Sequence, residues 1–347
     1  MTGADTRPAL SVVVPCHDEA ESLPVLHRRL AAVCRDLGLA HEIVLVDDGS
    51  RDATWAEIAA LARRDPAVRG IRLARNHGHQ LALTAGLAAA RGDRVFMLDA
   101  DLQDPPELLP EMMARMDAGY DVVYGQRIRR AGETWFKRAS AHLFYRLISR
   151  LADVEIPRDV GDFRLVSRRI LDHFLAMPEH ARFVRGMFAW LGHPQCAVAF
   201  ERDARHAGVT KYPLRRMLRF AGDALTGFST APLRIATLMA YVAFLVAGGL
   251  AIYGVVVALA GLTVPGWASL IFAVAFFSGM QLLTLGIIGA YLGRLYMEAK
   301  GRPLFLVAET TPGVAPDIVP EGAPDIAPEG APGVVPEPCP GDGAGLP

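Results

Sequence analysis

The chain has 347 residues, of which 52% are hydrophobic and 21% are charged, and its mean hydropathy is +0.24. Soluble globular domains usually carry about 25% charged residues. The difference arises near the C-terminus, because no Asp, Glu, Lys, Arg or His occurs in the 59 residues from Ile235 to Gly293. About 20 apolar residues are enough for one helix to cross a bilayer, so the composition excludes a wholly soluble protein.

The formal net charge of −1 is unevenly distributed. Seven acidic residues and no Lys or Arg occur from Glu309 onward, so the preceding part of the chain is net basic. A basic body beside a membrane segment suits anionic lipid headgroups or phosphorylated substrates. No nucleic-acid-binding motif accompanies this charge, so nucleic acid is not an expected partner. The four cysteines lack paired spacing, which argues against a disulfide or zinc framework.

Residues 1–232 alternate short β-branched runs with helical patterns, which predicts an α/β domain on a mostly parallel sheet. The expected strands are 11–15, 42–46, 68–74, 94–98 and 121–124, and the expected helices are 20–37, 52–64 and 80–90. Continuous apolar runs in the second and fourth strands indicate that both faces of the sheet are covered.

Residues 233–300 are expected to form a hairpin of two transmembrane helices, at 235–259 and 267–291. The flanking basic residues are Arg215, Arg216, Arg219 and Arg234 before the hairpin and Arg294, Lys300 and Arg302 after it. The positive-inside rule then predicts a multi-pass protein of the cell (inner) membrane with both termini in the cytoplasm. Two basic, amphipathic segments at 135–151 and 217–228 are expected to lie at the lipid headgroups.

Residues 309–347 contain an octapeptide repeat that reads APDIVPEG, APDIAPEG and APGVVPEP. Frequent Pro, acidic residues and the absence of aromatic residues cannot bury enough apolar surface to offset the entropy of ordering. We therefore expect a disordered tail.

Three polar clusters follow predicted strands, at 15–19, 47–52 and 99–103. The carboxyl ends of parallel strands meet at one edge of a sheet, which is where ligands bind in open α/β folds. Each cluster alone also has an ordinary explanation, because Asp48-Gly49-Ser50 could be a turn with a helix cap and Asp-x-Asp is common. Their occurrence together favours a binding site.

The third cluster offers the oxygen ligands that a hard divalent cation prefers. Asp99 and Asp101, one residue apart at a strand end, can turn carboxylates toward one ion, and Gln103 adds an amide oxygen. Mg²⁺ or Mn²⁺ suits such a set and would neutralise a diphosphate leaving group. The chain lacks the glycine-rich phosphate loops of dinucleotide and Walker-type ATP sites.

The strings VVVPCHDEAE, EIVLVDDGSRDAT, ARNHGHQLALTAGLAAARGD and MLDADLQDPPE resemble family-2 glycosyltransferases of the GT-A fold. The resemblance extends over about residues 10–305 and is nearest to polyprenyl-phosphate hexosyltransferases, the branch of dolichol-phosphate mannose synthase and bacterial undecaprenyl-phosphate glucosyltransferases. It implies a GT-A Rossmann-like domain followed by a membrane hairpin. It also implies inverting transfer of a hexose from a nucleotide sugar to polyprenyl phosphate. VGDFRLVSR favours UDP-glucose as donor, with GDP-mannose second.

The resemblance implies roles for individual residues. Those expected to bind the nucleoside are Pro15, His17, Glu19, Asp47 and Asp48. Asp101 and Gln103 would hold Mg²⁺ or Mn²⁺, with Asp99 nearby. Those expected to face the phosphates are Arg127, Arg205 and Lys211, and the candidate catalytic residues are Asp162, Arg127 and Arg164.

Asp162 is not needed as a strong base, because a phosphate acceptor with a second pKa of about 6 is already anionic near pH 7. Asp162 is therefore expected to orient the acceptor or a basic partner such as Arg164, rather than to take a proton. A purely structural Asp–Arg pair at a turn is the alternative.

Two other functions fit these residues less well. A membrane-tethered nucleotidyltransferase would need a Gly-rich basic loop after the first strand, which 15–19 lacks. A non-catalytic sugar-nucleotide-binding module would be expected to lose metal ligands, yet all three are present. His17-Asp18 replaces the Tyr-Asn usual in the family, so the resemblance does not fix which base is bound. The QxxRW signature of processive synthases is absent and only one hairpin follows the catalytic domain, which favours transfer of one sugar. Membrane lipid is an expected partner, and a homo-oligomer is left open.

Overall fold

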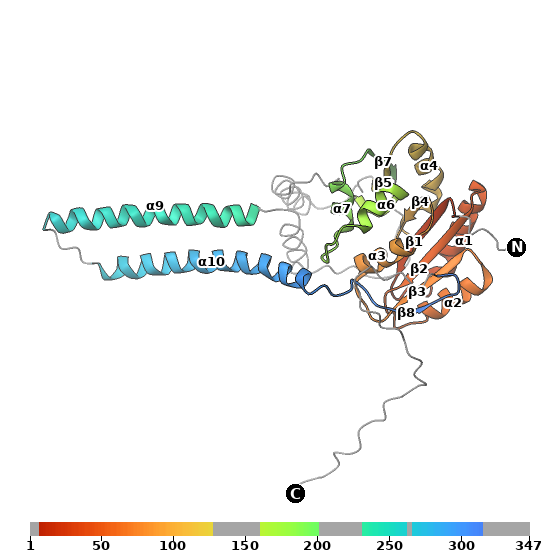
Figure 1. Ribbon diagram of the computed structural model, residues 1–347, viewed down its shortest axis with the longest axis horizontal. Coiled ribbons are helices and arrows are strands. Elements are labelled where there is room, and N and C mark those ends of the chain that lie inside the picture. The colour runs from red at the N-terminus through yellow and green to blue at the C-terminus, as the bar shows by residue number, and fades with distance from the viewer. Residues whose placement is uncertain (1–6, 128–159, 201–230, 262–265, 315–347) are drawn as a thin grey trace, which may run out of the picture.

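The computed structural model describes residues 7–127, 160–200, 231–261 and 266–314. An eight-stranded sheet has the order β7-β5-β6-β4-β1-β2-β3-β8 (Figure 1). The strands are β1 Leu10–Cys16, β2 His41–Asp47, β3 Val68–Leu73, β4 Arg94–Met97, β5 Val122–Arg127, β6 Val160–Ser167, β7 Gln195–Phe200 and β8 Val307–Thr310. The helices of this domain are α1 Leu23–Leu37, α2 Thr54–Arg64, α3 His79–Ala89, α4 Leu109–Asp117, α6 Arg168–Leu175 and α7 Val184–Trp190, with a 3₁₀ turn η1 at Pro106–Leu108.

The centre of the sheet is the parallel unit that the sequence predicts. Strands β4, β1, β2 and β3 pair in parallel, with Val13 opposite Val44 on one side and Met97 on the other. The α/β expectation is therefore confirmed. The strand β6 was not expected and runs antiparallel between β4 and β5, so the sheet is mixed.

Apolar side chains cover both faces of the sheet, because successive residues of a strand point to opposite sides. Val12 and Val14 belong to a core formed with α1, α2 and α4. Val13 lies in the second core, which α3, α6 and α7 complete. This double burial explains the continuous apolar runs of the central strands.

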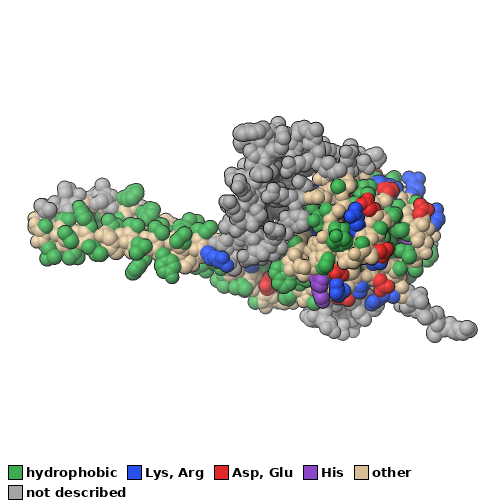
Figure 2. Space-filling model, turned by 90° about the horizontal axis from the view of Figure 1, so that it is seen from above, with side chains coloured by type: hydrophobic (Ala, Val, Ile, Leu, Met, Phe, Trp, Pro, Cys, Tyr) green, Lys and Arg blue, Asp and Glu red, His purple; other side chains and the backbone are tan. Residues whose placement is uncertain are grey.

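Two long apolar helices, α9 (Ala231–Leu259) and α10 (Trp267–Ala299), lie side by side and project from the α/β domain (Figure 1). Their segments Pro232–Val257 and Phe272–Ala299 are long and apolar enough to cross a membrane. Figure 2 shows hydrophobic side chains along both helices and charged side chains over the α/β domain. The two helices match the sequence expectation, whereas their orientation in a bilayer stays a prediction.

After α10 the chain returns to the sheet, which changes where the predicted tail begins. Residues 307–310 form β8, antiparallel to β3, and Thr311 is buried at the same edge. The structure thus places Glu309 and Thr310 in the sheet rather than in a disordered tail. The segments 135–151 and 217–228, expected at the headgroups, and residues 315–347 of the tail lie outside the described residues.

Candidate active site

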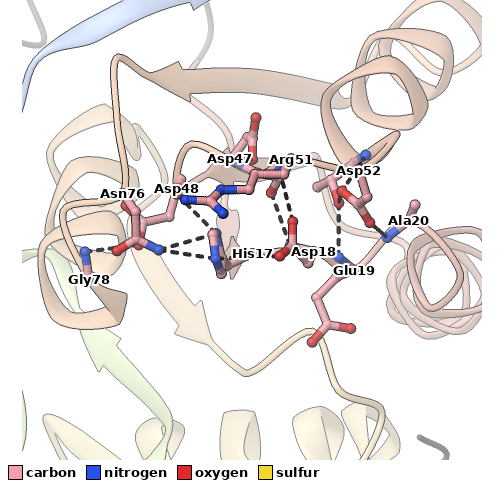
Figure 3. Close-up of polar contacts among 12 residues, drawn as sticks. His17, Asp18, Glu19, Ala20, Asp47, Asp48, Arg51, Asp52, Asn76 and Gly78 are labelled. Carbon is pink, nitrogen blue, oxygen red and sulfur yellow. Dashed lines mark hydrogen bonds and ion pairs between the residues drawn. The ribbon is translucent and has the colours of Figure 1, made fainter. Parts of the chain in front are cut away.

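The loops after β1 and β2 are joined by hydrogen bonds between polar side chains and backbone amides (Figure 3). The amide of Asp18 donates to Ser50 Oγ at 3.0 Å, and the amide of Arg51 donates to Asp18 Oδ1 at 2.9 Å. The amide of Ala20 donates to Asp52 Oδ2 at 3.2 Å. These contacts fix the two loops against each other at the carboxyl edge of the parallel strands.

The acidic pair that ends β2 is buried and holds the neighbouring loops. Asp48 is 2% exposed, and its two oxygens accept hydrogen bonds from the amides of His77 at 2.7 Å and Gly78 at 2.9 Å. Burial raises the pKa of Asp48, and these two hydrogen bonds oppose the rise. Asp47 is fully buried, and its Oδ1 accepts from the amide of Ser50 at 3.0 Å. Contact of either acid with a nucleoside stays a prediction.

His17 lies exposed beside these acids. Its Nδ1 lies 3.1 Å from the carbonyl oxygen of Asp48, and Asn76 Nδ2 lies 3.1 Å from its Nε2 (Figure 3). A carbonyl only accepts hydrogen bonds, so the contact with Asp48 requires a proton on Nδ1. Gly49 lets the loop after β2 approach the loop after β3: its φ is +63°, and a Cβ there would lie 2.5 Å from the backbone carbon of Arg75.

The other two residues expected at the nucleoside differ in exposure. Pro15 is buried within β1, opposite Val46. Glu19 is half-buried; its amide donates to Thr54 Oγ1 at 2.8 Å, and its carboxylate accepts from Ser22 Oγ at 2.6 Å. The structure therefore brings Glu19 to the edge, while Pro15 supports the loop from beneath.

The acids after β4 form a tight turn. Asp101 Oδ1 accepts from the amide of Gln103 at 3.2 Å, and Leu102 between them has φ +61°, in the left-handed region that few side chains adopt. Asp99 Oδ1 is buried and has no hydrogen-bond partner among the described residues. Burial raises the pKa of Asp99, as do the nearby carboxylates of Asp162 and Asp101, against the opposing effect of His79.

The oxygen atoms of these side chains are of the kind that binds a divalent cation. An unsatisfied buried carboxylate oxygen, a second carboxylate and an amide are the oxygen set that Mg²⁺ and Mn²⁺ take. The residues concerned are Asp99, Asp101 and Gln103.

The antiparallel strand β6 adds a further acid to this edge. Met97 of β4 lies opposite Arg164 of β6, so Asp99 and Asp162 follow on the two strands at matching positions. Asp162 is 3% exposed on its side chain. Register alone therefore brings together two acids that are 63 residues apart in the sequence.

Three side chains from two helices bind the Asp162 carboxylate. Its Oδ2 accepts from His79 Nε2 at 3.0 Å and from Gln80 Nε2 at 2.9 Å, and its Oδ1 accepts from Arg185 Nε at 2.9 Å. Burial raises the pKa of Asp162, but the hydrogen bond from His79 and the charge of Arg185 outweigh burial and hold it well below its usual range. Asp162 is consequently an ionised carboxylate and a weak base.

His79 connects this acid to the acids after β4. Its Nε2 lies 3.5 Å from Asp99 Oδ1, and the ligand atoms of His79, Asp99 and Asp162 all lie within 4.8 Å of one another. Burial lowers the pKa of His79, but the hydrogen bond to Asp162 and the charge of Asp99 raise it above its ordinary value.

Gln80 fixes the helices around Asp162. Its Oε1 accepts from the amide of Val184 at 2.9 Å, while its Nε2 donates to Asp162. A backbone amide only donates and a carboxylate only accepts, so one orientation of the Gln80 amide satisfies both. Gln80 thereby ties the first turn of α3 to the first turn of α7 and to β6.

The two arginines expected at the catalytic centre have different surroundings. Arg127, the last residue of β5, lies 3.7 Å from the buried carboxylate of Asp104. Arg164 is buried, donates to the carbonyl of Gly161 at 3.0 Å and lies 5.1 Å from the centre of the Phe188 ring. Burial lowers the pKa of Arg164 to about 10.

The expectation that Arg164 is the basic partner of Asp162 needs correction, because Arg185 makes those hydrogen bonds. Residues 162 and 164 share a face of β6, but the guanidinium of Arg164 turns back toward its own strand. Arg205 and Lys211 lie outside the described residues.

Sequence reasoning did not single out the residues that surround Asp162. His79 and Gln80 stand in the quoted string ARNHGHQLALTAG, and a polar pair after a glycine at a helix start was the available signal. Arg185 lies in a helix without a motif, so nothing local to it indicated its role.

Comparison with known proteins gives the family. Residues 11–175 match the model described as glycosyl transferase family 2. The uncharacterized glycosyltransferase YkcC of Bacillus subtilis is 43% identical over 304 residues, which cover 86% of this chain and 93% of that protein. A prophage bactoprenol glucosyl transferase homolog of Escherichia coli is 37% identical, covering 86% of this chain and 98% of the relative. The bactoprenol glucosyl transferase of Shigella phage SfII is 36% identical, with 88% and 99% covered. The chain therefore belongs to glycosyl transferase family 2 and is a glycosyltransferase.

Proposed function

We propose that the chain transfers one glucosyl residue from UDP-glucose to a polyprenyl phosphate in the membrane, with inversion at the anomeric carbon. The carrying observation is that one chain joins an acid-rich sheet edge to a hairpin of two apolar helices. Relatives named as bactoprenol glucosyl transferases are similar to this chain over almost their whole length, which supports both the sugar and the lipid acceptor.

Asp99, Asp101 and Gln103 would hold Mg²⁺ or Mn²⁺. When bound, the cation neutralises the charge that develops on the nucleoside diphosphate. Oδ1 of Asp99 supports this assignment, because it is buried, accepts no hydrogen bond from the described residues and has only a longer contact of 3.5 Å with His79 Nε2.

The nucleoside would lie against the loops after β1 and β2. His17 and Glu19 are accessible there, while Pro15, Asp47 and Asp48 are buried and set the shape of the loops. Arg127, Arg205 and Lys211 remain our candidates for the phosphates.

Asp162 would act by orientation rather than as a proton acceptor. A polyprenyl phosphate is already anionic near pH 7, and the two oxygens of Asp162 already accept four hydrogen bonds from three side chains. The carboxylate holds His79 and Arg185, whose side chains remain 43% and 37% exposed and can contact an anionic substrate. We assign Arg164 to support of β6 beneath this site.

The test uses membranes that contain the full chain, labelled UDP-glucose or GDP-mannose, and undecaprenyl phosphate. We expect label in the lipid fraction from UDP-glucose, a β-linked product by NMR, and no transfer by the Asp101→Ala variant. Label from GDP-mannose alone would make the chain a mannosyltransferase. Binding of nucleotide sugar without any transfer would favour a non-catalytic module.

A further inference from the structure

The segment that follows α10, residues 301–314, is bound along the edge of the sheet; we call it the strap (Figure 1). It begins at the end of the second apolar helix, where His180 Nε2 donates to the carbonyl of Arg302 at 2.6 Å. Phe305 is 2% exposed in the core beneath α3, and the amide of Ala74 donates to the carbonyl of Leu306 at 2.8 Å. The strap is therefore part of the folded catalytic domain.

Beyond these contacts the strap pairs with β3. Thr311 exchanges two hydrogen bonds with Gly70: its Oγ1 accepts from the Gly70 amide at 2.7 Å, and its own amide donates to the Gly70 carbonyl at 2.9 Å. A Cβ on Gly70 would lie 2.6 Å from Ile58 Cγ2 of α2 and 2.9 Å from Thr311 Cγ2, so this glycine lets both α2 and the strap pack against β3. Arg69 donates to the carbonyl of Gly313 at 2.6 Å and forms a buried ion pair with Glu42.

Glu309 connects the strap to side chains of the domain. Its Oε1 accepts from Arg72 Nη1 at 2.8 Å, and its Oε2 accepts from Trp55 Nε1 at 2.8 Å. The Arg72 guanidinium also approaches Asp47, with Nε 3.6 Å from Oδ2. Arg72 thus lies between Glu309 of the strap and Asp47, the last residue of β2.

Asp47 is where this chain of contacts reaches the candidate site. It is fully buried, and its Oδ2 has no hydrogen bond from the described residues, so Arg72 is the positive charge that faces this oxygen. Its Oδ1 holds the amide of Ser50. Arg72 cannot be displaced without removing the charge partner of a buried carboxylate that fixes the loop after β2.

A second contact reaches the same loop independently. Ala74, which the strap binds through Leu306, precedes Arg75, and the backbone of Arg75 lies against Gly49. The strap therefore supports the loop after β2 at two points, through Arg72 and through the backbone of Arg75.

We propose that the strap is a structural part of the donor site and that Glu309 is a positioning residue, which fixes Arg72 and through it Asp47 and the loop 49–52. Because the strap directly follows α10, donor binding depends on a segment that the membrane hairpin anchors. The inference rests on the donor site proposed above, which is UDP-glucose at the carboxyl edge of β1 and β2.

The first measurement compares Glu309→Gln with a matched control, Glu298→Gln, an exposed acid in the last turn of α10. Glu309 and Arg72 are 52% and 36% exposed, so their ion pair is partly screened. We expect about a threefold rise in the KM for UDP-glucose and in the Kd for UDP, with kcat and the KM for undecaprenyl phosphate within about twofold. The control should match the wild type. Equal donor constants for the two variants would overturn the proposal.

A double-mutant cycle tests whether Glu309 acts through Arg72. Arg72→Gln removes the partner of Asp47 as well, and we expect about a tenfold rise in donor KM. The double variant should match Arg72→Gln alone. If the rises in donor KM of the two single variants multiply in the double variant, Glu309 does not act through Arg72.

Thermal unfolding is the control that the compared variants are folded. Binding of UDP to the wild type distinguishes failure of the proposed function from failure of the strap proposal. A wild type that binds no UDP contradicts the proposed function. A wild type that binds UDP with the same Kd as Glu309→Gln contradicts the role of the strap.

Discussion

Two acidic clusters lie at the same edge of the sheet, and they are bonded in opposite ways. At the end of β2 the carboxylates of Asp47 and Asp48 accept from backbone amides, as Asp48 does from His77 and Gly78. The Asp162 carboxylate accepts only side-chain hydrogen bonds in the described structure, from His79, Gln80 and Arg185. Acids bonded to the backbone set the shape of loops, whereas an acid bonded to side chains orients groups that can also contact substrate.

This contrast predicts two classes of substitution, one that lowers stability and one that lowers the rate of transfer. Removal of a loop-setting acid leaves buried amides unsatisfied and lowers the free energy of unfolding. Removal of an acid that orients side chains, or of a metal ligand near the surface, should lower the rate more than the stability.

The largest expected effect is on the metal ligands. Asp101→Ala should reduce transfer to background, because the charge on the diphosphate is no longer neutralised, while the thermal midpoint changes little. EDTA should inactivate the wild type, and Mg²⁺ or Mn²⁺ should restore it. Full activity in EDTA would contradict the metal assignment.

Asp162→Asn should come next. Hydrogen bonds to a charged group contribute about 1.5–3 kcal/mol, so kcat should fall at least about tenfold. The pKa of Asp162 is held below its ordinary value, so the ionised carboxylate stabilises the folded state. This stabilisation is present above the unfolded pKa of about 3.9 and is lost as the pH falls through the folded pKa. The rate profile should then show no Asp162 inflection between about pH 5 and 8. An inflection there that Asp162→Asn abolishes would make Asp162 a base.

Asp48→Ala should have the opposite result, a larger loss of stability than of rate. Two backbone amides lose their acceptor, at about 1–3 kcal/mol for each unsatisfied group, so chemical denaturation should show a lower free energy of unfolding. The KM for the donor should rise by several fold and kcat should change less. A stable variant with a large loss of kcat would remove the distinction between the two clusters.

The smallest effect should come from shortening the chain after Val314. The strap is retained, and the expected disordered repeat is lost, so transfer should stay within about twofold of the wild type. Termination after Pro303 is the matched comparison, because it removes Phe305 and β8 and should impair both stability and donor binding. Equal activity of the two shortened chains would contradict the role of the strap.

The sequence by itself determined the local patterns. Apolar runs and helical spacing located the parallel strands, the three crossover helices and the two long apolar helices, because each depends on side chains close together in the chain. Polar residues at strand ends placed 15–19, 47–52 and 99–103 at one edge, since parallel strands with intervening helices end on the same side.

Only the tertiary structure decided which distant groups meet. The antiparallel insertion of β6 sets Asp162 beside Asp99, and packing of α7 supplies Arg185 in place of the expected Arg164. The four residues of β8 have no pattern of their own, and they pair with β3 across more than 230 residues of sequence. Register and edge pairing depend on hydrogen bonds between whole strands, which no local run of residues specifies.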